Sequence, residues 1–133
     1  MILKAGTILI NKNKIGLIYR DYYDDYSFPK GHLEEGETLL ECAIRETNEE
    51  TKREVVVLDK EPIYIENYID SKGNNCTCYY YVVKDNGPSD NDSLEVHDLK
   101  WTNFNDVEDL LTYDSTKTLW NLVKEKIKKY IEE

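Results

Sequence analysis

The 133-residue chain is poor in the features that mark secreted, membrane-spanning or nucleic-acid-binding proteins. It has three cysteines, an odd number without C-x-x-C spacing, which indicates neither a disulfide framework nor a zinc site. Its 17 lysines and arginines are outnumbered by 27 aspartates and glutamates, and this net charge of -10 argues against general nucleic-acid binding. The sequence has no signal peptide and no apolar stretch of membrane length. We therefore predict a cytoplasmic protein with no membrane partner, in which residues 1–133 form a single domain.

The most informative segment covers residues 31–50 and reads GHLEEGETLLECAIRETNEE. From Thr38 it predicts a helix, because T-L-L-E places a hydroxyl at the N-cap and an acid at the third helical position. The carboxylates of Glu46, Glu49 and Glu50 follow at helical spacing, so they project into one small region. Like charges this close repel each other, and a hard cation such as Mg²⁺ relieves the repulsion through oxygen ligands. The segment therefore predicts a divalent-metal site.

The fixed residues of this segment resemble the signature of the Nudix hydrolases, which cleave nucleoside diphosphates linked to a second group. The matching positions lie within residues 31–52 and are Gly31, Glu37, Arg45, Glu46, Glu49 and Glu50. Two positions depart from the pattern, which usually has an aliphatic residue in place of Thr47 and a glycine in place of Lys52. Glycine after a helix supplies a left-handed backbone, so Lys52 predicts a differently built helix end.

The order of the apolar segments predicts an α/β protein. The resemblance implies a Nudix-type α/β/α sandwich, with a central mixed sheet, the signature loop-helix-loop and a C-terminal helix. Residues 2–10 and 14–19 are β-like runs that predict a hairpin, and from Ser115 apolar residues at helical spacing predict the last helix. Residues 86–93 are expected to be a loop. Further strands are predicted at 54–58, 63–69, 77–83 and 98–104.

For the reaction, the resemblance implies two or three Mg²⁺ ions, for which Mn²⁺ can substitute. Their ligands would be Glu46, Glu49, Glu50, the carbonyl of Lys30 and Glu95. Either Glu49 or Glu95 would instead orient or deprotonate the attacking water. Asp92 and Asp98 are rivals for the role of Glu95. Glu37 and Arg45 are expected to hold the loop against the helix, a task that supports the catalytic acids without touching the substrate.

The loop ahead of the helix carries the signal for the substrate. Residues 26–32 read YSFPKGH, which resembles the branch of the family that hydrolyses dinucleoside polyphosphates, especially the asymmetric diadenosine tetraphosphate hydrolases. In such a loop Lys30 would supply a cation to the phosphates, and His32 would offer a hydrogen-bond donor or a stacking ring. The resemblance thus implies a small nucleotide as partner, most specifically a dinucleoside polyphosphate.

Tyrosine is abundant, with 11 residues, and some of these rings are candidates for stacking on adenine. Side chains alternate along a strand, so Tyr79 and Tyr81 share one face of the predicted strand and Tyr80 takes the other. We expect the pair Tyr79 and Tyr81 to supply a ring to the pocket, with Tyr113 as a further candidate.

The expected reaction is the conversion of diadenosine tetraphosphate to ATP and AMP. Rival readings are a nucleoside triphosphate pyrophosphatase for nucleotide-pool sanitation, an RNA 5′-pyrophosphohydrolase and a diphosphoinositol polyphosphate hydrolase. The strong negative charge argues against the last two. A catalytically silent nucleotide-binding sensor is a rival of a different class, but it requires damage to the acidic cluster, which is whole. The oligomeric state is left open.

Overall fold

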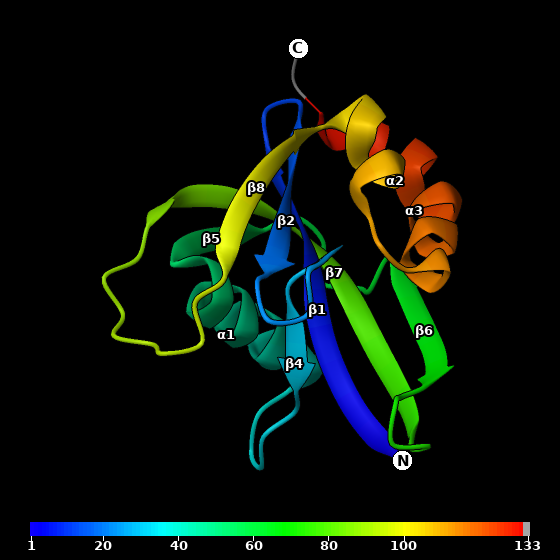
Figure 1. Ribbon diagram of the computed structural model, residues 1–133. Coiled ribbons are helices and arrows are strands. Elements are labelled where there is room, and N and C mark those ends of the chain that lie inside the picture. The colour runs from blue at the N-terminus through cyan, green and yellow to red at the C-terminus, as the bar shows by residue number, and fades with distance from the viewer. Residues whose placement is uncertain (132–133) are drawn as a thin grey trace.

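One long strand, β1 (Ile2–Asn11), lies at the centre of the sheet and organises the fold (Figure 1). The computed structural model describes residues 1–131. Strand β1 pairs antiparallel with β2 (Lys14–Arg20) and with β4 (Lys30–His32), and parallel with β7 (Asn75–Pro88). The hairpin formed by β1 and β2 confirms the prediction for residues 2–19. The parallel pair makes the sheet mixed, as the resemblance implied.

The remaining strands extend the sheet on both sides of β1. The main path runs β3-β2-β1-β7-β5, with β8 on β2 and β6 on β7. Strands β5 and β6 pair with different halves of β7. Our expectation of a loop from residue 86 was wrong, because the pairing of β5 with β7 continues to Arg53 and Pro88 and keeps residues 86–88 in the strand. The bounds of these strands are β3 Asp25–Ser27, β5 Arg53–Val57, β6 Tyr64–Ile69 and β8 Asp98–Asn103.

Helices cover both faces of the sheet and complete an α/β/α sandwich (Figure 1). Helix α1 (Leu39–Thr51) lies on one face, and α3 (Asp114–Ile127) lies on the other with the short α2 (Val107–Leu110). The larger apolar core lies on the α3 side, where Trp120 is almost fully buried. Two 3₁₀ turns, Phe104–Asp106 and Lys128–Tyr130, flank these helices. No helix within residues 1–131 is both long and apolar enough to span a bilayer.

Helix α1 begins as predicted but ends differently from our expectation. The Thr38 hydroxyl accepts from the backbone N–H of Glu41 at 3.1 Å, and the Glu41 side chain accepts from the backbone N–H of Thr38 at 2.8 Å. Lys52 was expected to change the helix end, but it adopts the left-handed conformation itself, with φ 56° and ψ 37°. Its N–H still donates to the carbonyl of Asn48 at 2.9 Å. The usual cap geometry is therefore kept with a lysine, at a cost of about 1 kcal/mol.

The second departure from the family pattern, Thr47, is explained by a contact between α1 and β1. Its hydroxyl lies 2.7 Å from that of Thr7, and both side chains are fully buried. The Thr47 hydroxyl also donates to the carbonyl of Ala43 at 2.8 Å, so the hydroxyl of Thr7 is the donor within the pair. A polar residue is tolerated at this apolar position because it is hydrogen-bonded on both sides.

Candidate active site

Arg45 holds the loop between β4 and α1 against the helix. Its guanidinium donates to the two carboxylate oxygens of Glu37 at 3.0 and 2.7 Å, and to the carbonyl of His32 at 2.9 Å. The hydrogen bonds from Arg45 lower the pKa of Glu37 to about 2. Arg45 also donates to a carboxylate oxygen of Glu46 at 2.8 Å. One side chain therefore fixes both the loop and the direction of an acid that the sequence predicted as a metal ligand.

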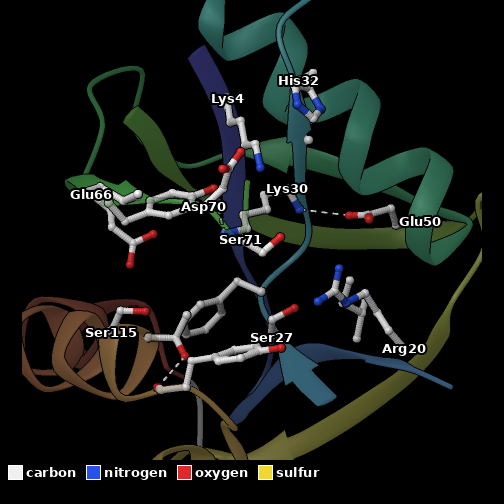
Figure 2. Close-up of a pocket in the computed structure, with 17 residues that line it drawn as sticks. Lys4, Arg20, Ser27, Lys30, His32, Glu50, Glu66, Asp70, Ser71 and Ser115 are labelled. Carbon is white, nitrogen blue, oxygen red and sulfur yellow. Dashed lines mark hydrogen bonds between the residues drawn. The ribbon is translucent and has the colours of Figure 1, made fainter. Parts of the chain in front are cut away.

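Glu50 is directed towards β4. One carboxylate oxygen accepts from the backbone N–H of Lys30 at 2.9 Å, as the dashed line in Figure 2 shows. The other oxygen lies 3.7 Å from Nε2 of His97. Burial raises the pKa of Glu50 to about 8. A cation close to this carboxylate would therefore stabilise its ionised form.

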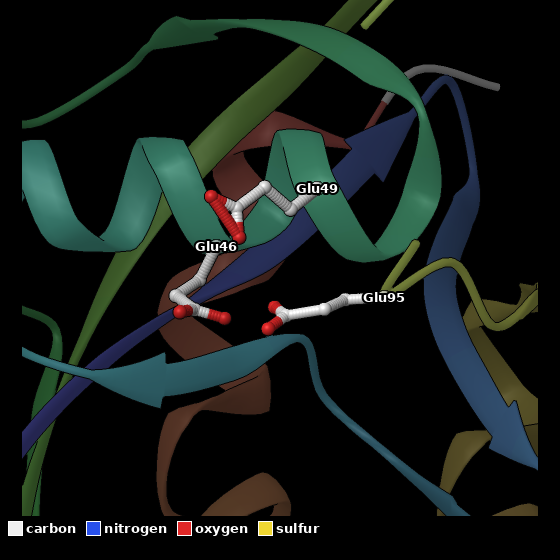
Figure 3. A group of neighbouring side chains, drawn as sticks. All are labelled: Glu46, Glu49 and Glu95. Carbon is white, nitrogen blue, oxygen red and sulfur yellow. The ribbon is translucent and has the colours of Figure 1, made fainter. Parts of the chain in front are cut away.

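The acids that lie together in the structure are not the set that helical spacing alone predicted. Glu46 and Glu49 on α1 meet Glu95, which lies in the segment between β7 and β8, and one oxygen from each lies within 4.8 Å of the others (Figure 3). Glu50, which we expected to share one small region with Glu46 and Glu49, stands beside this group because the Lys30 N–H holds it. Within residues 1–131, neither Asp92 nor Asp98 belongs to the group.

The arrangement fits a divalent cation. All donors are carboxylate oxygens, which hard cations prefer. Burial raises the pKa of Glu46, and the contact with Glu49 raises that of Glu95, so the acids destabilise one another's charged forms. A Cβ atom at position 31 would clash with the Glu46 carboxylate, so a larger residue there would displace this acid from its present direction. The glycine of the signature thus leaves room for the acid.

A pocket of about 560 Å³ opens next to this cluster, on the α3 side of the sheet (Figure 2). Gly31 and Glu50 line it, so the pocket adjoins the acids. Its other lining residues include three cations and three aromatic rings: Lys4, Arg20, Lys30, Phe28, Tyr68 and Tyr113. His32 also lines it, and burial lowers the pKa of this imidazole. Lys30, His32 and Tyr113, which the sequence predicted as substrate-binding residues, thus all line this pocket.

Two of the pocket side chains are held by a buried acid behind them. Asp25 is only 1% exposed, and it accepts from Nε of Arg20 at 2.8 Å and from the hydroxyl of Tyr113 at 2.5 Å. The Arg20 guanidinium holds the pKa of Asp25 below its usual range. Arg20 is thus charged and fixed at the pocket wall, and the Tyr113 ring remains 44% exposed beside it.

Sequence reasoning missed Tyr68 and Arg20. The Tyr68 ring lies 4.6 Å from the ammonium of Lys30 and 5.5 Å from that of Lys4, within the range of cation–π contacts. Alternation along β6 was the available signal for Tyr68, because it puts this ring on the same face as buried Glu66. Arg20 carried no local signal, since its position depends on how β2 pairs with β3.

Tyr79 and Tyr81 are not where we expected them. Both pack beneath α1, in the small cluster that contains Cys42 and Ala43, and neither lines the pocket. The alternation itself was correct, since Tyr80 faces the α3 side. The tyrosines that line the pocket are Tyr68 and Tyr113.

Comparison with known proteins places this geometry in a family. The family model of the NUDIX domain matches residues 2–124. An 8-oxo-(d)GTP phosphatase of Mycolicibacterium smegmatis is 33% identical over 112 residues, which cover 84% of this chain and 34% of that protein. The chain thus spans about a third of the length of this relative.

Two further matches cover nearly the whole of both chains. The asymmetrical bis(5'-nucleosyl)-tetraphosphatase of Caenorhabditis elegans is 29% identical over 123 residues, which cover 85% of this chain and 88% of that protein. The crystal structure of a C. elegans Ap4A hydrolase binary complex has a TM-score of 0.80 at 23% identity, and it covers 97% of this chain and 99% of that chain. The structural match shows a common fold.

Proposed function

Because this chain belongs to the Nudix hydrolase family, we propose that it hydrolyses dinucleoside tetraphosphates asymmetrically, converting diadenosine tetraphosphate to ATP and AMP. The observation that carries the proposal is a pocket next to the acid cluster whose lining includes Lys4, Arg20 and Lys30. Glu46, which forms the cluster with Glu49 and Glu95, lies against Gly31 in the wall of this pocket. A diphosphate linkage held between cluster and pocket would have oxygen ligands for cations on one side and positive charge on the other.

Magnesium is the cation that this donor set suits best. The ion would be held by Glu46, Glu50 and the carbonyl of Lys30. Whichever of Glu49 and Glu95 does not activate the water would join them. When bound, Mg²⁺ would neutralise phosphate charge and polarise water. Mn²⁺ has similar preferences and should substitute for it.

The protein residues supply positioning and charge. Glu95 is exposed and comes from a segment outside α1, so it can approach a water without disturbing the helix. We assign it, with Glu49 as the rival, to orienting or deprotonating the attacking water. Arg20 and Lys30 would hold the phosphate bridge in line for attack, and they stabilise negative charge that grows on the leaving oxygens.

A dinucleoside substrate makes use of more of this pocket than a mononucleotide does. Lys4, Arg20 and Lys30 can engage a bridge of several phosphates, and Tyr68 or Tyr113 can stack on one base. The loop YSFPKGH and the nematode relative, named as a tetraphosphatase, support this choice.

The second candidate is a nucleoside triphosphate pyrophosphatase. It is favoured by the mycobacterial relative, whose name specifies an oxidised guanine nucleotide. Such an enzyme would share the acid cluster, so only the substrate distinguishes the two functions. An RNA 5′-pyrophosphohydrolase is disfavoured by the net charge of -10, and a silent sensor by the intact cluster.

A substrate panel with chromatographic identification of the products tests the proposal. We expect kcat/KM for diadenosine tetraphosphate to exceed that for ATP, GTP and their oxidised deoxy forms by at least about tenfold. ATP and AMP should appear in equal amounts. ADP as the sole product would mean symmetric cleavage, and a better triphosphate substrate would replace this proposal with the pyrophosphatase.

A further inference from the structure

The segment between β7 and β8, residues 89–97, carries Glu95 but forms no helix or strand of its own. One oxygen of the Glu95 carboxylate lies within 4.8 Å of oxygens of Glu46 and Glu49 (Figure 3). Like charges at this distance repel one another, so without a cation the two acids of α1 push Glu95 away. The backbone of the segment must therefore be held in place by other contacts.

The end of α1 provides those contacts. The last carbonyls of an α-helix have no partner inside the helix, so they can accept from a neighbouring segment. The N–H of Ser89 donates to the carbonyl of Lys52 at 2.8 Å. The N–H of His97 donates to the carbonyl of Glu50 at 2.9 Å. These two backbone contacts hold the ends of the segment and leave residues 90–96 between them.

Asn91 adds a side-chain contact within that stretch. Its Nδ2 donates to the backbone carbonyl of Asn48 at 2.9 Å and to the side-chain oxygen of the same residue at 2.7 Å. Asn48 lies on α1 between Glu46 and Glu49 in sequence. Asn91 therefore binds the segment to the turn of the helix that carries the other two acids of the cluster.

The oxygen of the Asn91 amide connects this anchor to Glu95. It accepts from the N–H of Ser93 at 2.9 Å, and the Ser93 hydroxyl accepts from the N–H of Glu95 at 3.0 Å. Side chains of asparagine and serine that bond the backbone two residues ahead fix local turns. We propose that Asn91 is a positioning residue for Glu95: it fastens the segment to α1 and so holds the third acid of the cluster against repulsion by the other two.

This inference rests on the proposed function for the role of Glu95, but not on the choice of nucleotide. Misplacing a catalytic group by about 1 Å can lower the rate by about a hundredfold. Because the interaction of Glu95 is needed mainly in the transition state, loosening the segment should lower kcat and leave KM nearly unchanged.

Two variants at position 91 separate the two ends of the amide. Asn91→Ala removes both ends. Asn91→Asp keeps the shape and the acceptor for Ser93, but it loses the donor to Asn48 and brings negative charge to the negative end of the helix. Asp90→Ala, at an exposed position of the same segment, is the matched control. With Mg²⁺ present, kcat and KM are measured for whichever nucleotide of the substrate panel is cleaved best, and each variant is made with and without Glu95→Gln.

We expect kcat to fall about tenfold in Asn91→Ala and at least as far in Asn91→Asp, with KM changed by less than about threefold. In the Glu95→Gln background the same substitutions should lower kcat by less than about twofold, because the acid to be positioned is no longer there. The control should match its parent in both backgrounds. If Asn91→Ala does not fold, the isosteric Asn91→Asp replaces it in the comparison.

A measurement on the protein without metal or substrate gives a second readout. Nitrogen NMR relaxation yields the order parameter of the Glu95 backbone amide, which should be near the value of about 0.85 for rigid backbone in the wild type. In Asn91→Ala it should fall below about 0.6, the range of flexible backbone. Asp90→Ala should leave it unchanged.

Three results would overturn the inference. One is an unchanged kcat in both Asn91 variants, and another is an order parameter of Glu95 that does not respond to Asn91→Ala. The third is an equal loss of kcat with and without Glu95, which would mean that Asn91 does not act through this acid. Failure of the proposed function looks different: a nucleoside triphosphate would be the best substrate, and its hydrolysis would still depend on Asn91 through Glu95.

Discussion

The acids of α1 lie close together in sequence but have different surroundings. Glu46 is directed by Arg45 into the cluster with Glu49 and Glu95, while Glu50 is turned to the backbone of Lys30. Glu46 thus has a carboxylate oxygen available for a cation, on a side chain that is already fixed. Among these acids it is the one whose loss should damage the metal site most directly.

Glu46→Gln keeps the size of the side chain and removes its charge. We expect kcat in the presence of Mg²⁺ to fall by about a hundredfold or more, since a contact of this kind is worth several kcal/mol in the transition state. The melting temperature of the metal-free protein should hold or rise, because one of several repelling charges is lost. Glu35→Gln, at an exposed loop position, is the matched control. Full activity of the wild type in excess chelator would contradict the metal mechanism altogether.

Glu95→Gln tests the water-activating role. We expect kcat to fall far more than KM changes, because the interaction is needed mainly in the transition state. Asp92→Asn, in the same segment, and Asp98→Asn, at the start of β8, remove acids that do not join the cluster, so their kinetics should stay close to those of the wild type. An unchanged kcat for Glu95→Gln would show that Glu95 is an ordinary solvated surface residue. Glu49 would then be the candidate base.

The residues that could be predicted are those whose partners are near in sequence or fixed by a motif. Helical spacing predicted that Glu46 and Glu49 point the same way, and the family pattern pointed to Glu95. Tyr68 and Arg20 could not be assigned from the sequence, because their place in the pocket depends on strand pairings with distant segments. The errors with Tyr79 and Tyr81 have the same origin, since alternation defines two faces but not which of them carries the pocket.

The packing of α1 on β1 includes a buried hydroxyl pair that can be tested by a double-mutant cycle. Thr47→Val leaves the Thr7 hydroxyl buried without a partner, so we expect a loss of about 1–3 kcal/mol of unfolding free energy. Thr7→Val should be milder, because Thr47 still donates to Ala43. The double variant should lose less than the sum of the two single losses. Urea denaturation measures all three, and strict additivity would mean that the hydroxyls do not interact.

The end of α1 offers a gain in stability. Lys52 has a positive φ, so Lys52→Gly should relieve strain and raise the unfolding free energy by about 1 kcal/mol. Lys60→Gly is the matched control, because Lys60 is exposed and is not among the positive-φ residues. That control should lose stability, since glycine adds freedom to the unfolded chain. A loss of stability for Lys52→Gly in urea denaturation would show that the lysine side chain contributes more than the strain takes away.

Long elements with their own periodicity were predictable, and short ones were not. The capped helix α1 and the apolar side of α3 follow from spacing within each segment. Strands β3 and β4 have three residues each and exist because β2 and β1 offer them hydrogen bonds, so no local pattern marks them. The tail of β7 likewise persists through a glycine and a proline because β5 pairs with it.

For the whole protein, the net charge of -10 sets how stability responds to ions. We expect NaCl to raise the melting temperature modestly by screening, and MgCl₂ at equal ionic strength to raise it further by binding the folded site. Free Mg²⁺ at a hundred times its dissociation constant adds about 2.7 kcal/mol. In Glu46→Gln the additional effect of Mg²⁺ should largely vanish while the salt effect remains. Equal responses to the two salts in the wild type would argue against a specific site.

The parallel pairing of β1 with β7 also has a consequence for the order in which the chain can fold during synthesis. Its register joins residue 2 to residue 76 and residue 10 to residue 84, so each partner follows 74 positions later. At a ribosomal rate of about 5–20 residues per second, the central strand waits roughly 4–15 s for this neighbour. The Arg45–Glu37 clamp is only eight positions apart, so it can form during that interval. The acid cluster is completed later still, when Glu95 leaves the ribosome.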